Sequence, residues 1–119
     1  MYDAGRLQVI NACQTVTGSV TETYSSEDGD IDIRVALDPA YTALLNTANI
    51  TKIDGHLQVE AICQAAATTA SAQQACGNFH GSVTVPAVGD RVSVTGTYVL
   101  DTRHGWTEIH PVSVITSLP

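Results

Sequence analysis

Alternation of apolar and polar positions predicts that much of this chain is β-strand. Apolar side chains occupy every second position from Ile31 to Leu37, which places them on one face of an extended segment. Such a strand is typical of an antiparallel sheet with one face in the core and one in solvent. The hairpin turn signal Asp28-Gly29 precedes it. Residues 31–37 are therefore predicted to be the second strand of a hairpin.

Four further strands are predicted on similar grounds. They are residues 7–24, residues 57–62, residues 91–100 and a C-terminal strand that begins near 104 and runs through 115. The first contains Gly18, and the strand at 91–100 contains Gly96. Because a glycine inside a strand often marks a bulge or a sharp bend, these two strands can curl around a core.

Helical structure is expected to be minor. Asp38 can cap a helix that has Pro39 at its first position, so residues 40–45 are predicted to form a short helix. Residues 46–54 are polar and are predicted to be a loop. Residues 64–75 are mostly Ala, Gln, Ser and Thr, which is compatible with a helix or an ordered loop but poor in large apolar anchors.

Together these elements predict an all-β fold. A long bent first strand, a hairpin at each end and an insert after the third strand match the five-stranded Greek-key barrel called the OB-fold, with a small β-sandwich as the alternative. A chain of 119 residues is long enough for one core and too short for two ordinary domains. We expect residues 1–119 to form a single OB-like domain.

The charge of the chain limits its partners. Five Lys and Arg against twelve Asp and Glu give a formal net charge of −7 with the histidines neutral. Nucleic acid is therefore disfavoured as a partner, because its binding depends on clustered basic side chains and on aromatic rings that stack on bases. No apolar run approaches the roughly 20 residues of a membrane-spanning helix.

The cysteines favour a compartment outside the cytoplasm. Cys63 and Cys76 bracket the insert without the Cys-x-x-Cys spacing of metal sites, so a disulfide between them is predicted. It would stabilise the fold by roughly 3 kcal/mol in the chain-entropy model. Cys13 is then a buried small hydrophobe, a partner of one of the other two, or an intermolecular link. The glycosylation-type triplet at Asn49 adds little, and the expected location is extracellular or at the cell surface.

The segment His104-Gly105-Trp106-Thr107-Glu108-Ile109-His110-Pro111 concentrates the candidate chemistry. In an extended chain Trp106, Glu108 and His110 share one face, which puts a carboxylate beside an imidazole. Both groups are zinc-type ligands, and a divalent ion, zinc or calcium, is the predicted cofactor. The predicted ligands are His104, Glu108, His110 and Asp30, with Asp32 as an alternative to Asp30. The competing interpretation is structural, with the same side chains bonded to neighbouring strands.

Motifs along nearly the whole chain carry a resemblance to a known family. They are Arg6-Leu7-Gln8-Val9-Ile10-Asn11-Ala12-Cys13, Thr15-Val16-Thr17-Gly18, Asp28-Gly29-Asp30, Leu37-Asp38-Pro39-Ala40-Tyr41, Leu44-Leu45-Asn46, Val59-Glu60, the two later cysteines, Val92-Ser93-Val94-Thr95-Gly96 and the segment 104–111. On these the chain resembles an uncharacterised family of small OB-fold-like proteins of archaea and bacteria. A histidine often stands in that family where this chain has Asp32, which would change the ligand set. The resemblance implies the fold and carries no activity.

Three functions fit these observations. The first is a small extracytoplasmic binding or interaction module of unknown ligand that holds a divalent metal at segment 104–111. The second is a metal-dependent phosphodiesterase, since Asp28-Gly29-Asp30 resembles the acidic turn of thermonuclease-type OB-fold enzymes and Arg34 and Arg103 could contact a phosphate. The third is a structural subunit of a surface assembly, a homo-oligomer joined through sheet edges or Cys13. Whether the protein is an enzyme is left open.

Overall fold

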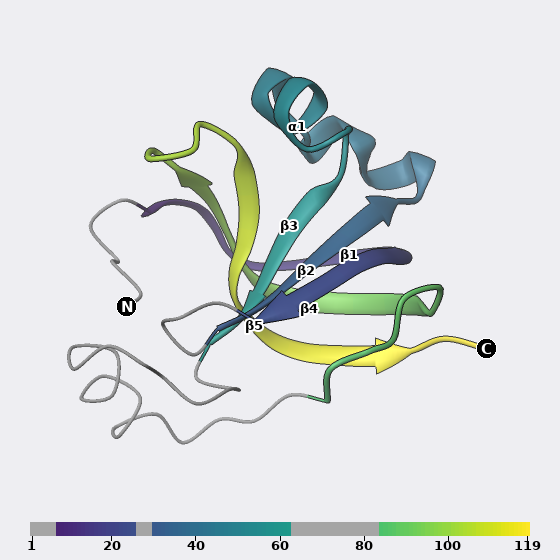
Figure 1. Ribbon diagram of the computed structural model, residues 1–119. Coiled ribbons are helices and arrows are strands. Elements are labelled where there is room, and N and C mark those ends of the chain that lie inside the picture. Colours follow the sequence, from purple (N-terminus) through teal and green to yellow (C-terminus); the bar gives the residue numbers. More distant parts are fainter. Residues whose placement is uncertain (1–6, 26–29, 63–83) are drawn as a thin grey trace.

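A computed structural model, described for residues 7–25, 30–62 and 84–119, shows a chain that is mostly β-strand (Figure 1). The strands are β1 (Leu7–Ser25), β2 (Ile31–Leu37), β3 (Leu57–Ala61), β4 (Arg91–Asp101) and β5 (Thr107–Ser117). The helices are the short 3-10 helix η2 (Pro39–Leu44) and the α-helix α1 (Thr47–Lys52). All five predicted strands are confirmed. None of the helices within the described ranges has the length and apolar character needed to cross a membrane.

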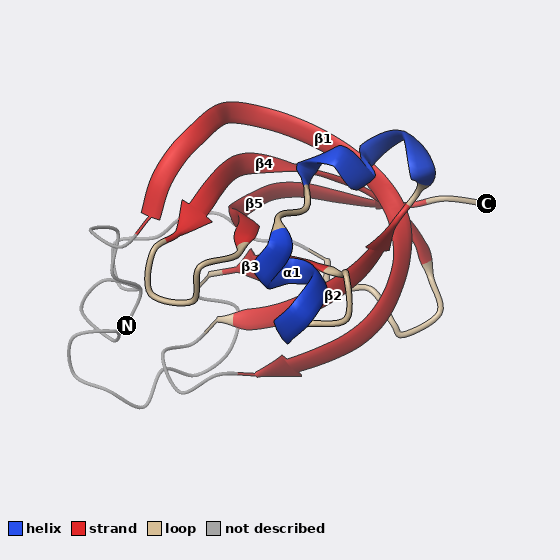
Figure 2. Cartoon of the chain, turned by 90° about the horizontal axis from the view of Figure 1, so that it is seen from above, coloured by secondary structure: helices blue, strands red, loops and turns tan. Residues whose placement is uncertain are grey.

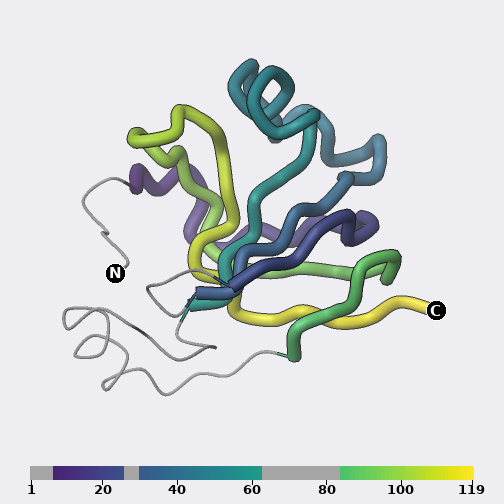
Figure 3. The backbone as a smooth tube through the Cα atoms, viewed as in Figure 1, coloured from purple at the N-terminus to yellow at the C-terminus, as the bar shows by residue number. Residues whose placement is uncertain are grey.

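The five strands close into a ring in the order β1-β2-β3-β5-β4, with β4 paired back onto β1. Neighbours are antiparallel except for β3 and β5, which are parallel. The contact of β3 with β5 is short, because only Gln58 with Glu108 and Val59 with Ile109 are in register. The tube in Figure 3 lets the reader follow β1 from its pairing with β4 to its pairing with β2.

Close backbone contact explains the glycines inside β1 and β4. Gly18 pairs with both Leu37 and Val92, so β1 passes there from β4 to β2. A Cβ at Gly18 would lie 2.4 Å from the Ala36 carbonyl oxygen, which no neighbouring strand could tolerate. Gly96 lies between two shifts in the β4–β5 register, and its Cβ would lie 2.5 Å from the Pro111 carbonyl oxygen.

The core fills the inside of the ring. Its buried members alternate with outward residues, as the period of two predicts. They are Val16, Val20, Ile33, Val35, Leu57, Val59, Ala61, Val92, Val94, Tyr98, Ile109 and Val112. Both short helices lie over one end of the ring, where Tyr41, Leu44 and Leu45 pack against the core (Figure 2).

One helical prediction is confirmed except for its capping bond, and the other was wrong. The segment predicted as a helix at 40–45 is the 3-10 helix η2, and Asp38 precedes it without a side-chain capping bond because its carboxylate accepts from Arg91 instead. The prediction of a loop at 46–54 was wrong, since α1 lies there. Asn46 and Asn49 form a reciprocal capping box, each side chain accepting from the other's backbone N–H.

The cysteine predictions have different outcomes. The predicted disulfide between Cys63 and Cys76 lies outside the described residues. Cys13 is a free thiol and is exposed, so the interpretation as a buried hydrophobe was wrong. It lies between Asn11 and Gln14, where the pairing of β1 with β4 changes register, and such an irregularity releases side chains from the regular alternation of faces.

Candidate metal centre

The outer face of β3 and β5 is polar and yet buried. Val59 and Ile109 point into the core, so Glu60, Glu108 and His110 point to the opposite face of their strands. An outward face of a small sheet is normally solvated. Here Glu60 is 8% exposed, and Glu108 and His110 are each 1% exposed. Burial of ionisable groups has a high free-energy cost, and the burial of these three side chains therefore marks the region as a candidate site.

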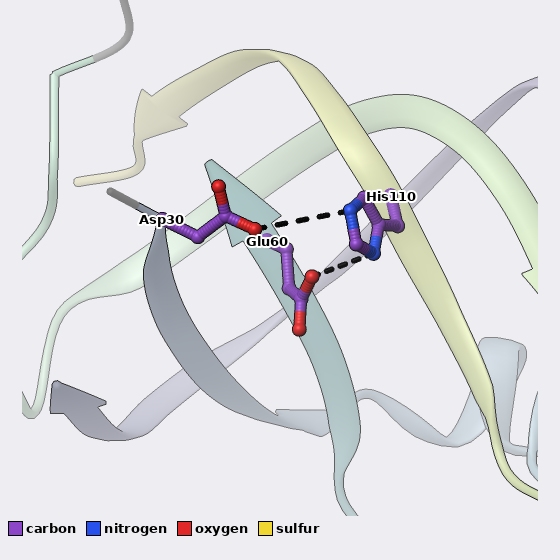
Figure 4. Close-up of side chains that lie close together, drawn as sticks. All are labelled: Asp30, Glu60 and His110. Atoms are coloured by element: carbon purple, nitrogen blue, oxygen red, sulfur yellow. Dashed lines mark ion pairs between the residues drawn. The ribbon is translucent and has the colours of Figure 1, made fainter. Parts of the chain in front are cut away.

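Three side chains from separate parts of the sheet and its edge turn toward one another (Figure 4). Asp30 directly precedes β2, Glu60 lies on β3 and His110 lies on β5. The imidazole Nδ1 of His110 is 2.6 Å from Glu60 Oε2, and its Nε2 is 4.0 Å from Asp30 Oδ2. One ligand atom from each of the three residues falls within 4.8 Å of the others, so this group could hold a metal ion.

Glu108 links this group to Trp106. Its Oε1 lies 3.0 Å from His110 Nδ1, and its Oε2 accepts a hydrogen bond of 2.8 Å from the indole Nε1 of Trp106. The sequence predicted that Trp106, Glu108 and His110 share one face, and these contacts confirm it. Trp106 in turn stacks on His104, with ring centroids 4.4 Å apart.

A second group of possible ligands lies at the turn between β4 and β5. It contains Asp101, His104 and Glu108, with His104 Nδ1 2.8 Å from Asp101 Oδ2. Asp101 Oδ1 also accepts from the backbone N–H groups of Arg103 and His104, which is the usual role of an aspartate that begins a turn. Turn geometry is therefore sufficient to explain this group.

Electrostatics at His110 favour the charged ring. Burial is the largest single effect and disfavours the imidazolium, but hydrogen bonds with Glu108 and Glu60, together with their negative charges, outweigh it and raise the pKa of His110 to about 9. Burial raises the pKa of Glu108, and the charge of Glu60 adds to the effect, while hydrogen bonds from His110 and Trp106 oppose it. A protonated His110 therefore contributes positive charge to this cluster.

The structure divides the predicted ligands between the two groups. It brings Asp30 and His110 together, and it brings His104 and Glu108 together with Asp101. Glu60 was not among the predicted ligands. Its alternation with Val59 and Ala61 places it on the outer face of β3, but only the pairing of β3 with both β2 and β5 shows that it meets His110.

Asn49 was noted in the sequence only as part of a glycosylation-type triplet. It is 0% exposed, and its amide nitrogen donates to the carbonyl oxygens of His56 and Thr107. Its Oδ1 accepts from the backbone N–H and the hydroxyl of Thr107. In the folded chain the side chain is therefore a buried anchor that fixes the start of β5, and it offers no surface for a glycan.

Arg34 stays within the polar face of the sheet. Its Nε donates to Gln58 Oε1 at 2.6 Å and its NH2 group donates to the Tyr24 hydroxyl at 3.1 Å. Its guanidinium carbon lies 5.8 Å from the ring centroids of both Tyr24 and Trp106. The predicted role of Arg34 as a phosphate contact therefore competes with these bonds. Asp28 and Gly29 of the acidic turn lie outside the described residues.

Comparison of the chain with protein-family models, with curated proteins and with solved structures finds no match in any of the three. The candidate centre is therefore judged on its own geometry and charge.

Proposed function

We propose that this protein is a binding module that holds a divalent cation between Asp30, Glu60 and His110. The observation that carries the proposal is that a buried imidazole on β5, a buried carboxylate on β3 and another just before β2 bring ligand atoms within 4.8 Å of one another. Carboxylate oxygen and imidazole nitrogen form the usual ligand set of zinc, and oxygen-rich sites also take calcium.

Charge supports the proposal. Asp30, Asp32, Glu60 and Glu108 are each 8% exposed or less, and within the described ranges the cationic side chains of His110 and Arg34 lie close to this group. Buried carboxylates are stable when paired or when they coordinate a metal. A divalent ion that displaces the proton of His110 would add positive charge beside these carboxylates.

Spacing favours one side of the imidazole. Two ligands at zinc-type distances of about 2.1 Å in a tetrahedral shell lie roughly 3.4 Å apart, and never more than about 4.2 Å. The 4.0 Å between His110 Nε2 and Asp30 Oδ2 leaves room for an ion between these atoms after a small side-chain movement. The 2.6 Å between Nδ1 and Glu60 Oε2 is too short for an ion between these two atoms, so the Glu60 carboxylate would turn away from Nδ1 to reach the ion.

We also propose that the ring is an OB-like Greek-key barrel. The strand order β1-β2-β3-β5-β4, the long first strand shared by two neighbours and the parallel contact of β3 with β5 support this assignment over a sandwich. The fold by itself specifies no ligand, so the function rests on the centre. An extracellular or cell-surface location remains a prediction from the cysteines.

Metal retention tests the proposed centre. Protein stripped with a chelator is dialysed against zinc or calcium, then against buffer, and its metal is measured by elemental analysis. We expect stoichiometric metal in the wild type and loss in His110→Ala. Because removal of a buried ring can prevent folding, Asp30→Asn serves as a second variant, with circular dichroism to check both. A wild type that retains neither ion, and whose melting temperature neither ion shifts, would contradict the proposal.

His104→Ala decides between the two groups of ligands. This variant removes the turn histidine and leaves Asp30, Glu60 and His110 intact. We expect it to retain metal as the wild type does. Loss of metal in His104→Ala, with retention in Asp30→Asn, would move the ion to Asp101, His104 and Glu108.

A second candidate function is a subunit of a surface assembly. Cys13 is exposed, and the nearby Val9 and Ile10 are 64% and 57% exposed on the same strand. Apolar exposure beside a free thiol favours contact between copies of the chain. Size-exclusion chromatography with and without reductant, on wild type and Cys13→Ser, tests it, and a monomer under all four conditions would exclude it. The phosphodiesterase remains an alternative to be tested with nucleic acid and manganese or calcium.

A further inference from the structure

The contacts of Glu108 suggest a role other than direct ligation. Both of its carboxylate oxygens are engaged, Oε1 with His110 Nδ1 at 3.0 Å and Oε2 with the Trp106 indole N–H at 2.8 Å. The side chain is 1% exposed. A carboxylate held at both oxygens can fix the orientation of the group that it touches.

Glu108 faces one particular nitrogen of the imidazole. Ionised carboxylate oxygens only accept hydrogen bonds, and Glu108 Oε1 lies 3.0 Å from Nδ1. Nδ1 therefore carries a proton, and Nε2, which faces Asp30, is the nitrogen that can bind an ion. Metal-binding histidines generally donate their other N–H to a carboxylate in this way, which fixes the ring and raises its basicity.

From this geometry we infer that Glu108 and Trp106 are positioning residues which present His110 Nε2 to the cation, and that the centre prefers first-row transition ions such as zinc over calcium. The inference rests on the proposed cation site. Imidazole suits zinc and its neighbours, whereas calcium takes six to eight oxygen ligands. An imidazole ring that is held with Nε2 toward the ion adds a nitrogen ligand. Calcium gains little affinity from such a ligand.

Calorimetric titration with zinc and with calcium tests the inference on the full chain. We expect wild type to bind zinc at least tenfold more tightly than calcium. Glu108→Gln should weaken zinc binding by roughly 10- to 100-fold, the usual effect of losing such an orienting partner. Trp106→Phe keeps an aromatic ring and removes only the N–H, so it should weaken zinc binding by a smaller factor. Glu22→Gln removes the same charge from an exposed side chain and should bind zinc as wild type does.

A spectroscopic measurement separates positioning from mere support of the fold. Nitrogen-15 NMR of the histidine rings should show the zinc-bound His110 coordinated through Nε2 with its proton on Nδ1, and the Glu108→Gln variant should populate the other arrangement. Equal zinc affinity in wild type and Glu108→Gln, coordination through Nδ1, or calcium bound as tightly as zinc would each overturn the inference while leaving the cation site standing. Absence of any metal binding in wild type would remove both.

Discussion

Asn49 illustrates how one buried polar side chain can set the position of a site that it does not touch. Its amide makes hydrogen bonds in both directions with Thr107, the residue before Glu108. It also donates to the carbonyl of His56, the residue before β3. One side chain therefore fixes the starts of both strands that carry Glu60 and His110.

Removal of the Asn49 side chain should lower the stability of the fold. Asn49→Ala leaves the backbone groups of Thr107 and His56 buried without these partners, and each such group costs about 1–3 kcal/mol. We expect the free energy of unfolding, measured by urea denaturation, to fall by at least about 2 kcal/mol. Ile50→Ala is the matched control, since Ile50 lies next in α1 and is 59% exposed. Equal losses in the two variants would contradict the anchoring role.

Elements are joined at the end of β2 by an ion pair on the surface. Asp38, which follows β2, accepts two hydrogen bonds of 2.6 and 2.9 Å from Arg91, the first residue of β4. The Thr17 hydroxyl on β1 donates to the same carboxylate. One carboxylate therefore ties together β1, β2 and β4, three strands whose order was not evident from the sequence.

The pair predicts a particular dependence of stability on pH. The Arg91 guanidinium, helped by the Thr17 hydroxyl, lowers the pKa of Asp38 to about 2, whereas an unfolded aspartate titrates near about 3.9. A carboxyl with a lowered pKa stabilises the fold above its unfolded pKa, and this contribution is lost as the pH falls through the folded value. The melting temperature of wild type should therefore exceed that of Asp38→Asn at pH 7, with the gap closing toward pH 2.

Arg91→Gln supplies the control for this prediction. In that background the partner is absent, so Asp38→Asn should change the melting temperature at pH 7 by less than it does in the wild type. A gap of the same size at pH 2 and at pH 7, measured by circular dichroism, would show that the carboxylate charge is not what joins these strands.

In the whole molecule, the candidate centre lies at the contact between β3 and β5, which completes the ring. This short strand contact is called the seam. Only two residue pairs are in register between β3 and β5, whereas β1 and β2 share seven. Glu60 and His110 face each other across this seam, and Asp30 joins them from the start of β2. A cation held there would act on the contact that completes the ring.

Hydrogen exchange tests this effect on the closed sheet. Zinc at about 100 times its dissociation constant stabilises the folded state by about 2.7 kcal/mol. Hydrogen exchange should then slow about 100-fold for those amides that exchange only when the metal site opens. We expect this protection in β3 and β5, with less in the β1–β2 hairpin. Uniform protection of all five strands, or the same pattern in Asp30→Asn, would contradict closure of the seam by the ion.

Local pattern was sufficient for the strands, for the faces that they present and for the pairing of Glu108 with His110. Each of these follows from a period of two along a short stretch of chain, and that period is set by the backbone alone. Pattern failed at α1 because the capping box of Asn46 with Asn49 lies in a polar stretch without apolar periodicity. It failed at Cys13 because the register of β1 against β4 shifts there.

Contacts between distant residues were decided only by the tertiary structure. Asp30, Glu60 and His110 are separated by 30 and 50 positions, and they meet because β3 pairs with β2 on one side and with β5 on the other. No local pattern encodes which strands become neighbours in a closed sheet, since that depends on how the whole core packs. The sequence therefore determined which face of its strand each side chain occupies, and ring closure determined which side chains face one another and are buried.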